Sequence, residues 1–170
     1  MKKIHFIGIG GIGMSALAQY FLAKGWQVSG SDLIAPEMTE RLKQASVEIF
    51  IGHKALNLLE KVDRVVYSAA IHDDNPEMEQ AKVLDCEILS YAQTLGELTR
   101  QYITLAVSGA HGKSTTTALL ALILIKAGLD PTVIVGTRLK ELDGANFRIG
   151  KSRYLIIEAD EYNKSFFNFY

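Results

Sequence analysis

The residues of this sequence with the clearest chemical potential form a glycine-rich loop that ends in a lysine and a serine. The loop reads Gly109-Ala110-His111-Gly112-Lys113-Ser114 and is followed by Thr115. Backbone N–H groups of such a loop can surround a phosphate, the lysine adds a mobile positive charge, and the serine hydroxyl can bind Mg²⁺. The usual triphosphate loop has a further glycine where this chain has Val107, so the loop is a shortened variant. We predict that residues 109–115 bind ATP, with Lys113 as the catalytic residue and His111 either donating to a phosphate or capping the turn.

Acidic residues that follow a later apolar strand supply candidate metal ligands. Glu158-Ala159-Asp160-Glu161 comes directly after the predicted strand 154–157. Because open α/β sheets place their ligands beyond the carboxyl ends of the strands, Glu158 is expected on the same rim as Lys113 and Ser114. We therefore predict that Ser114 and Glu158 hold Mg²⁺, while Asp160 and Glu161 could contact either metal or substrate. The alternative is a solvated acidic loop.

A second glycine loop lies at the start of the chain, after the predicted strand 4–7. Gly8-Ile9-Gly10-Gly11-Ile12-Gly13 carries the Gly-x-Gly-x-x-Gly spacing and opens a helix. Asp32 ends the second predicted strand, about 20 residues further on, where a carboxylate can accept hydrogen bonds from a ribose. The pattern predicts a site for a nucleotide diphosphate, and NAD, FAD and nucleotide sugars all fit it. The alternatives are a tight turn that packs helix on strand, and a solvated Asp32.

The elements that position these loops are strands and helices in alternation, and the pattern restarts near Arg100. We expect a Rossmann-like α/β domain with a parallel sheet over residues 1–100. Residues 101–170 are expected to begin a P-loop α/β domain that is incomplete. The predicted helices cover about 14–22, 37–45, 75–84, 92–99 and 115–127, and the predicted strands 4–7, 26–30, 48–51, 64–68, 87–89, 102–107, 132–135 and 154–157.

Composition places the chain among ordinary globular proteins. It is 48% hydrophobic and 22% charged with a net charge of −1, so nothing indicates a nucleic-acid or membrane partner. The apolar run 118–125 is far shorter than the roughly 20 residues of a membrane helix. The single cysteine, Cys86, cannot form an internal disulfide, which favours a reducing compartment and a cytoplasmic protein. The terminal aromatic run 166–170 needs a packing partner, so we expect an N-terminal fragment of a longer protein.

Two phosphate-binding loops in consecutive domains resemble the Mur ligases, which build the peptide of bacterial cell-wall precursors. The resemblance covers the whole chain. It is carried by Ile7-Gly8-Ile9-Gly10-Gly11-Ile12-Gly13-Met14-Ser15, Ser29-Gly30-Ser31-Asp32, Tyr67-Ser68-Ala69-Ala70-Ile71, Asn75-Pro76-Glu77 and Glu158-Ala159-Asp160-Glu161. Together these stretches are far more specific than either glycine loop alone.

The resemblance implies an ATP-dependent ligase of peptidoglycan synthesis in the cytoplasm. The chain most resembles the family member that joins L-alanine to the carboxylate of UDP-N-acetylmuramate through an acyl phosphate, with ATP and Mg²⁺ in the central domain. The site for L-alanine would lie mostly outside this chain. The residues implied for UDP-sugar binding are Gly8, Gly10, Gly11, Ile12, Gly13, Met14, Ser15, Asp32, Ser68, Asn146 and Arg148.

The chain departs from the family pattern at two places. Ala110 and Ser114 stand where the family has threonines, and Val135-Gly136-Thr137 replaces a double glycine, with consequences that the sequence leaves open. Because later residues of the central domain and the C-terminal domain are absent, we expect this chain alone not to catalyse ligation.

Three other interpretations compete. The first is a muropeptide-recycling ligase that joins a tripeptide to the same sugar nucleotide, but the opening loop 8–13 favours the alanine-adding enzyme. The second is an NAD-dependent oxidoreductase, which leaves Lys113 and Ser114 unexplained. The third is a non-catalytic nucleotide-binding module, against which the acidic cluster at Glu158 argues.

Overall fold

The computed structural model describes residues 1–34, 39–142 and 144–159. The chain divides into two compact units, Met1–Tyr91 (unit 1) and Ala92–Tyr170 (unit 2). Most of α4 (Tyr91–Thr99) falls in unit 2 by this division, whereas the predicted boundary followed residue 100. Asp160, Glu161 and the aromatic run lie outside the described residues, as does part of the helix predicted at 37–45.

Unit 1 is built on a five-stranded sheet in the order β3-β2-β1-β4-β5. All of its strand pairs are parallel, which confirms the predicted Rossmann-like sheet. The strands are β1 (Lys3–Ile7), β2 (Gln27–Asp32), β3 (Glu48–Ile51), β4 (Arg64–Tyr67) and β5 (Glu87–Ser90). This order changes direction beside β1, and doubly wound sheets bind their ligands at such a point, beyond the carboxyl ends of the strands.

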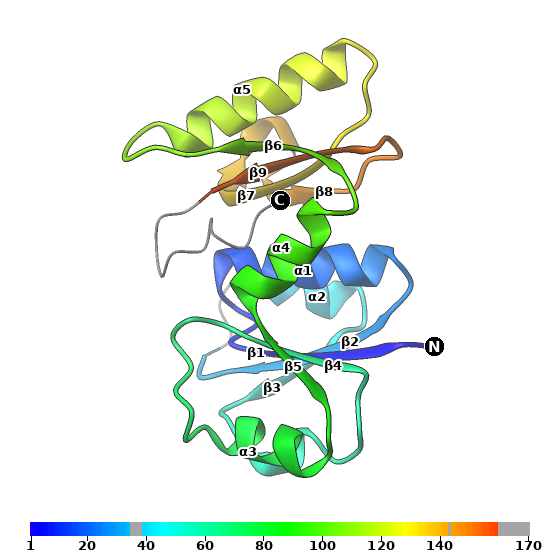
Figure 1. Cartoon of the computed structure of the whole chain (residues 1–170), viewed down its shortest axis with the longest axis vertical. Helices are drawn as coiled ribbons and strands as arrows, with labels where there is room; N and C mark the ends of the chain where they lie inside the picture. Colours follow the sequence, from blue (N-terminus) through cyan, green and yellow to red (C-terminus); the bar gives the residue numbers. More distant parts are fainter. Residues whose placement is uncertain (35–38, 143, 160–170) are drawn as a thin grey trace. The chain divides into compact units, whose positions relative to one another are not determined.

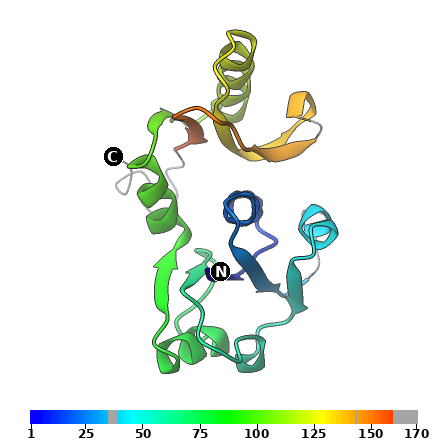
Figure 2. The same ribbon diagram turned by 90° about the vertical axis from the view of Figure 1, so that its right-hand side faces the viewer.

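Helices cover both faces of this sheet (Figures 1 and 2). α1 (Ile12–Ala23) and α2 (Glu40–Gln44) lie on one face, and α3 (Pro76–Val83) and the short helix η2 (Ala55–Asn57) lie on the other. Residues 4–7 of the central strand are accordingly all fully buried, as expected for a parallel strand covered on both sides. One of these four residues is polar: His5 lies in the core on the face of α3.

Unit 2 contains a four-stranded sheet in the order β6-β9-β7-β8. Its strands are β6 (Ile103–Val107), β7 (Thr132–Leu139), β8 (Ala145–Arg148) and β9 (Tyr154–Glu158), and the 3-10 helix η3 (Lys140–Leu142) links β7 to β8. α5 (Lys113–Lys126) packs Ala118 and Ala121 against Val133, Val135 and Ile156. The sequence missed β8, which runs antiparallel to β7, because its four residues alternate too briefly to stand out from a loop.

Candidate nucleotide-binding sites

The first glycine loop connects β1 to α1, where the sequence placed it. Gly8 has a φ of +86°, a conformation that side chains rarely adopt. A β-carbon at Gly8 would also lie only 2.8 Å from the hydroxyl oxygen of Ser68. Ser68, which follows β4, therefore lies directly against the loop, so the structure brings these two predicted residues together.

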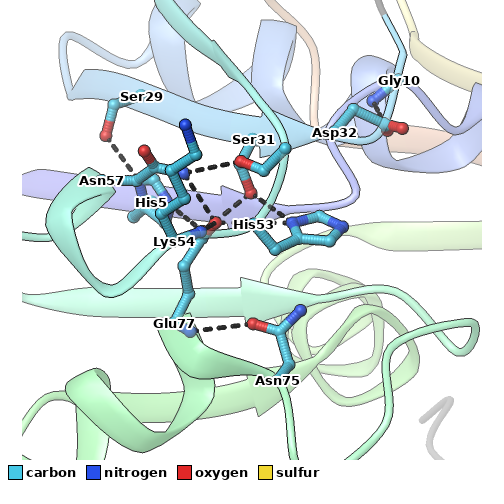
Figure 3. A network of polar contacts seen from close by, with 11 residues as sticks. His5, Gly10, Ser29, Ser31, Asp32, His53, Lys54, Asn57, Asn75 and Glu77 are labelled. Carbon is cyan, nitrogen blue, oxygen red and sulfur yellow. Dashed lines mark hydrogen bonds and ion pairs between the residues drawn. The ribbon is translucent and has the colours of Figure 1, made fainter.

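The amide groups of this loop point into unit 1. The N–H groups of Gly8 and Ile9 donate to the carbonyl of Ser31 at 2.8 and 3.0 Å, and the N–H of Gly11 donates to Gly8 at 3.2 Å. The N–H of Gly10 donates to Asp32 Oδ2 at 2.8 Å (Figure 3). Asp32, predicted to accept from a ribose, thus also braces the loop with one of its carboxylate oxygens.

The amides available to an anion lie one step further along, in the first turn of α1. Gly13 and Met14 occupy that turn, where helix geometry provides no carbonyl acceptor for the N–H groups. The helix N-terminus adds a partial positive charge there. The side chains of Met14 and Ser15 are buried, and the Ser15 hydroxyl donates to the carbonyl of Ile12 at 2.9 Å. Any contribution of Met14 to a diphosphate therefore comes from its backbone.

The second glycine loop connects β6 to α5 in unit 2 (Figure 1). Gly109 and Gly112 have φ angles of +145° and +77°, which explains why glycine is needed at both ends of the turn. Lys113 begins α5, and its Nζ donates to the carbonyl of Gly109 at 2.9 Å, so the ammonium group lies across the loop. Ser114 and Thr115 follow in the first turn of the helix. This strand–loop–helix arrangement is the one that a phosphate site requires.

His111 is exposed at the tip of the loop. Its side chain makes no hydrogen bond within the part of the chain that the structure describes. Both roles considered for it, a contact with phosphate and capping of the turn, stay predictions. Ala110 is exposed beside it.

Glu158 ends β9 next to the start of the phosphate loop. It is in register with Val107, and the N–H of Ala159 donates to the carbonyl of Val107 at 2.9 Å. Glu158 Oε1 is buried and has no hydrogen-bond partner among the described residues. An unpartnered buried carboxylate oxygen is costly, and at a phosphate loop its chemistry fits a cation ligand.

Two further observations concern the surroundings of this carboxylate. Thr117, one turn along α5 from Lys113, also has a buried hydroxyl oxygen without a partner among the described residues. Within those residues, no group of three or more His, Cys, Asp or Glu side chains is arranged to hold a metal. A Mg²⁺ site on Ser114 and Glu158 stays a prediction, and it would need no such group, because this ion commonly takes one or two protein oxygens beside phosphates and waters.

Asn146 and Arg148 both lie on β8, and Arg148 lies away from the phosphate loop of unit 2. Arg148 is in register with Val133, near the amino end of β7, whereas the loop follows the carboxyl end of β6. Its guanidinium donates to the carbonyl of Pro131 at 2.7 Å and pairs with Asp130. The hydrogen bond from Arg148, together with that from the backbone of Lys151, lowers the pKa of Asp130. Asn146 is buried, and the sugar-nucleotide role of both residues stays a prediction.

Sequence reasoning missed a buried polar network below the first glycine loop (Figure 3). Glu77 and His5 are both completely buried, and Glu77 Oε2 lies 2.8 Å from His5 Nε2 and accepts from the Ser31 hydroxyl at 2.7 Å. Glu77 Oε1 accepts from the Asn57 amide at 2.8 Å and from the Lys54 N–H at 3.1 Å. The only hints in the sequence were a histidine inside an apolar strand and the helix start Asn75-Pro76-Glu77.

The donors around Glu77 keep it ionised despite its burial. Burial alone would raise the pKa of Glu77, but the hydrogen bonds from His5, Ser31 and Asn57 and the positive charge that His5 can carry outweigh it. The pKa of Glu77 is therefore lowered from its ordinary value. Because the carbonyl of Ser31 also holds Gly8 and Ile9, the network is connected to the glycine loop through a single residue.

Taken together, the fold and the two loops define an α/β protein with two strand–glycine loop–helix units of the kind that bind nucleotides. The chain belongs to the Mur ligase family: the family model described as "Mur ligase family, catalytic domain" matches residues 3–103. A UDP-N-acetylmuramate–L-alanine ligase from Pelobacter propionicus is 49% identical over 98% of the chain. The chain spans 36% of the length of that relative.

Solved structures show the same likeness. A UDP-N-acetylmuramate–alanine ligase from Thermotoga maritima matches 93% of the chain, with a TM-score of 0.83 and 34% identity, over 37% of its own length. A murein peptide ligase from Psychrobacter arcticus matches 95% of the chain, with a TM-score of 0.87 and 32% identity, over 38% of its own length. A separate observation is that none of the described helices is long and apolar enough to cross a membrane.

Proposed function

We propose that this chain forms the sugar-nucleotide-binding and ATP-binding parts of a cytoplasmic ligase that joins L-alanine to UDP-N-acetylmuramate. The observation that carries the proposal is the presence of two glycine loops, each between a parallel strand and a helix, in consecutive units of one chain. One loop serves the diphosphate of the sugar nucleotide and the other serves ATP. The names of relatives with 49% identity over 98% of the chain support the alanine-adding activity.

In unit 2, ATP would be bound by residues 109–115. The first-turn amides of α5 and the ammonium of Lys113 face the phosphates, once Lys113 exchanges the carbonyl of Gly109 for a phosphate oxygen. Ser114 and Glu158 would hold Mg²⁺, which when bound neutralises part of the negative charge on the phosphates. Lys113 is the catalytic residue because its charge stabilises the phosphoryl group during transfer.

In unit 1, the diphosphate of UDP-N-acetylmuramate would bind at the N-terminus of α1. Gly13 and Met14 provide first-turn amides, and Asp32 and Ser68 lie on either side of the loop. The muramate carboxylate must then reach the γ-phosphate of ATP.

The chemistry proceeds by activation of that carboxylate. A carboxylate oxygen attacks the γ-phosphorus of ATP, the bond to ADP breaks, and an acyl phosphate forms. The amine nitrogen of L-alanine then attacks the carbonyl carbon and loses a proton. The new C–N bond forms as the C–O bond to phosphate breaks, and inorganic phosphate leaves with the bonding electrons. Activation is needed because a carboxylate has no good leaving group of its own.

A second candidate is a ligase that joins a peptide, in place of L-alanine, to the same sugar nucleotide. It is supported by the likeness to the murein peptide ligase from Psychrobacter arcticus, whose TM-score of 0.87 is slightly above the 0.83 of the alanine ligase from Thermotoga maritima. Competition between L-alanine and the tripeptide in the full-length protein separates the two. Preferential use of the tripeptide would reject the alanine assignment.

The function is tested with Lys113→Ala in the full-length protein. Turnover should fall at least a thousandfold, because this charge acts on the transferred phosphoryl group, while affinity for UDP-N-acetylmuramate should stay within twofold. Lys126→Ala removes an exposed lysine from the far end of the same helix and should leave both unchanged. Retained turnover in Lys113→Ala would overturn the ATP-site assignment.

A further inference from the structure

The imidazole of His53 lies at the rim of unit 1 where the first nucleotide would bind. β2 ends at Asp32 and β3 ends at Ile51, and these two residues are in register. Gly52 follows in a left-handed turn with a φ of +83°, and its N–H donates to the carbonyl of Asp32 at 2.7 Å. His53 is therefore next to Asp32 along the carboxyl edge of the sheet, on the side of β3.

The hydrogen bonds behind His53 determine which ring nitrogen carries a proton. His53 Nδ1 lies 2.9 Å from the Ser31 hydroxyl oxygen, and that hydroxyl donates its single proton to Glu77 Oε2. Ser31 can therefore only accept from His53, so Nδ1 must be the protonated nitrogen. The neutral ring then presents an unshared electron pair on Nε2.

Glu77 holds this arrangement in place. Its Oε1 lies 3.4 Å from His53 Nδ1, and the same carboxylate receives hydrogen bonds from Ser31, Asn57 and the Lys54 backbone. Glu77 is completely buried, whereas the His53 side chain keeps 12% of its surface exposed. A buried carboxylate that accepts several hydrogen bonds is rigid, so it fixes both the orientation and the tautomer of the histidine that it contacts.

The second ring nitrogen points away from this network. Figure 3 shows Nε2 on the side of the ring turned away from Ser31 and Glu77. It has no hydrogen-bond partner within residues 1–34, 39–142 and 144–159. Ser31 and Glu77 hold the ring in place through Nδ1, and Nε2 lies at the proposed ligand-binding edge. The ring can therefore accept a hydrogen bond from a ligand through Nε2.

We infer that His53 is a nucleoside-binding residue of unit 1, with Nε2 accepting a hydrogen bond from a hydroxyl or N–H group of the bound nucleoside, and that Glu77 is its positioning residue. The inference rests on the proposed sugar-nucleotide site. A phosphate is excluded as the partner of the neutral ring because phosphate oxygens only accept hydrogen bonds. The ligand group is therefore on the ribose or the base, beyond the loop that takes the diphosphate.

The test compares two substitutions, each of which keeps a polar group at the position of only one of the two ring nitrogens. His53→Asn retains an amide donor near the position of Nδ1 and loses the group at Nε2, whereas His53→Gln reaches the position of Nε2 and loses the donor to Ser31. Affinity for UDP, for 2′-deoxy-UDP and for inorganic pyrophosphate is measured by calorimetry on the full-length protein. ATP binding at unit 2 serves as the control for folding.

We expect His53→Asn to weaken UDP about tenfold, with pyrophosphate and ATP unchanged, and His53→Gln to recover part of the loss. If the partner is the ribose 2′-hydroxyl, 2′-deoxy-UDP binds wild type and His53→Asn equally; if it is the 3′-hydroxyl or the base, the tenfold difference persists. Equal UDP affinity in wild type and His53→Asn would overturn the inference, as would a loss confined to pyrophosphate. Absence of UDP binding to the wild type would instead reject the proposed function.

A second measurement reads the tautomer directly. The ¹⁵N NMR spectrum of the His53 ring in the ligand-free protein should show a protonated Nδ1 and an unprotonated Nε2, and UDP should shift the Nε2 signal. A ring protonated at Nε2 alone would contradict the arrangement with Ser31 and Glu77.

Discussion

Glu158 and Gly136 face each other across β9 and β7 so closely that a β-carbon on residue 136 would lie 2.8 Å from Glu158 Oε2. Because glycine has no side chain, residue 136 leaves room for the carboxylate of Glu158. The sequence left the role of Val135-Gly136-Thr137 open, and this contact gives one reason for its glycine. It also means that residue 136 controls where the proposed metal-binding carboxylate points.

Replacing Gly136 should weaken metal binding while leaving the fold intact. In Gly136→Ala we expect the Mg²⁺ concentration for half-maximal turnover of the full-length protein to rise about tenfold, because Glu158 must rotate away from the new methyl group. Affinity for UDP-N-acetylmuramate should not change. Thr137→Ala shortens the neighbouring side chain without adding an atom beside Glu158, and should behave as wild type. An unchanged Mg²⁺ requirement in Gly136→Ala would contradict the role given to Glu158.

Two glycines of unit 1 provide a matched test of the first loop. Gly8 and Gly25 have nearly equal φ angles, +86° and +81°, so alanine carries a similar backbone cost at both, about 1–2 kcal/mol. They differ in their surroundings: a β-carbon would meet Ser68 at Gly8, and nothing within 4 Å at Gly25. We expect Gly8→Ala to weaken UDP-sugar binding at least tenfold and Gly25→Ala to lower only stability.

Calorimetry with UDP-N-acetylmuramate and urea unfolding of each variant check this prediction. Gly25→Ala measures how much stability and affinity the strained backbone costs by itself. Any further loss of affinity in Gly8→Ala is then due to the contact with Ser68 in the loop. If both variants bound the sugar nucleotide as tightly as wild type, the loop after β1 would not be its site.

The sequence predicted those features that depend on neighbouring residues. A glycine loop after a strand is recognisable because strand, turn and helix are contiguous, and Asp32 and Glu158 were placed by counting to the ends of their own strands. The parallel order of the sheet follows from the same alternation. These are local patterns, and the fold of both units reproduces them.

The features that were missed depend on residues far apart in the chain. His5 and Glu77 are separated by 72 positions, and nothing in either segment states that a buried carboxylate will meet a buried imidazole. The inward direction of the amides of Gly8, Ile9 and Gly10 depends on Ser31 and Asp32, which belong to the next strand. The hairpin partner β8 is short and mixed in character. Such contacts become visible only when the strands are brought side by side.

The pairing of Arg148 with Asp130 predicts that these two residues act as a unit. Arg148→Ala and Asp130→Ala should each lower the urea midpoint of the chain, and the double variant should lose less than the sum of the two, because both single changes remove the same ion pair. Chemical unfolding of the three variants measures this. A loss of UDP-sugar affinity in Arg148→Ala that Asp130→Ala does not share would instead support the predicted sugar-nucleotide contact.

The buried network predicts how the stability of unit 1 depends on pH. Because the pKa of Glu77 is lower in the folded state than its ordinary value of 4.5, its contribution is complete above about that pH. The contribution is lost as the pH falls through the folded pKa, because the protonated carboxyl no longer accepts all of its hydrogen bonds. Glu77→Gln should therefore cost about 3 kcal/mol at pH 7, since it leaves buried donors without a charged acceptor. The cost should shrink steadily below pH 4.5.

Urea unfolding followed by the fluorescence of Trp26 measures this difference, since the only tryptophan of the chain belongs to unit 1. Glu79→Gln is the matched control, because Glu79 lies on the same helix, α3, and is exposed. It should change stability by less than about 0.5 kcal/mol at either pH. A difference between wild type and Glu77→Gln that stayed constant from pH 7 to pH 3 would show that Glu77 stabilises unit 1 by shape alone, and not as a carboxylate.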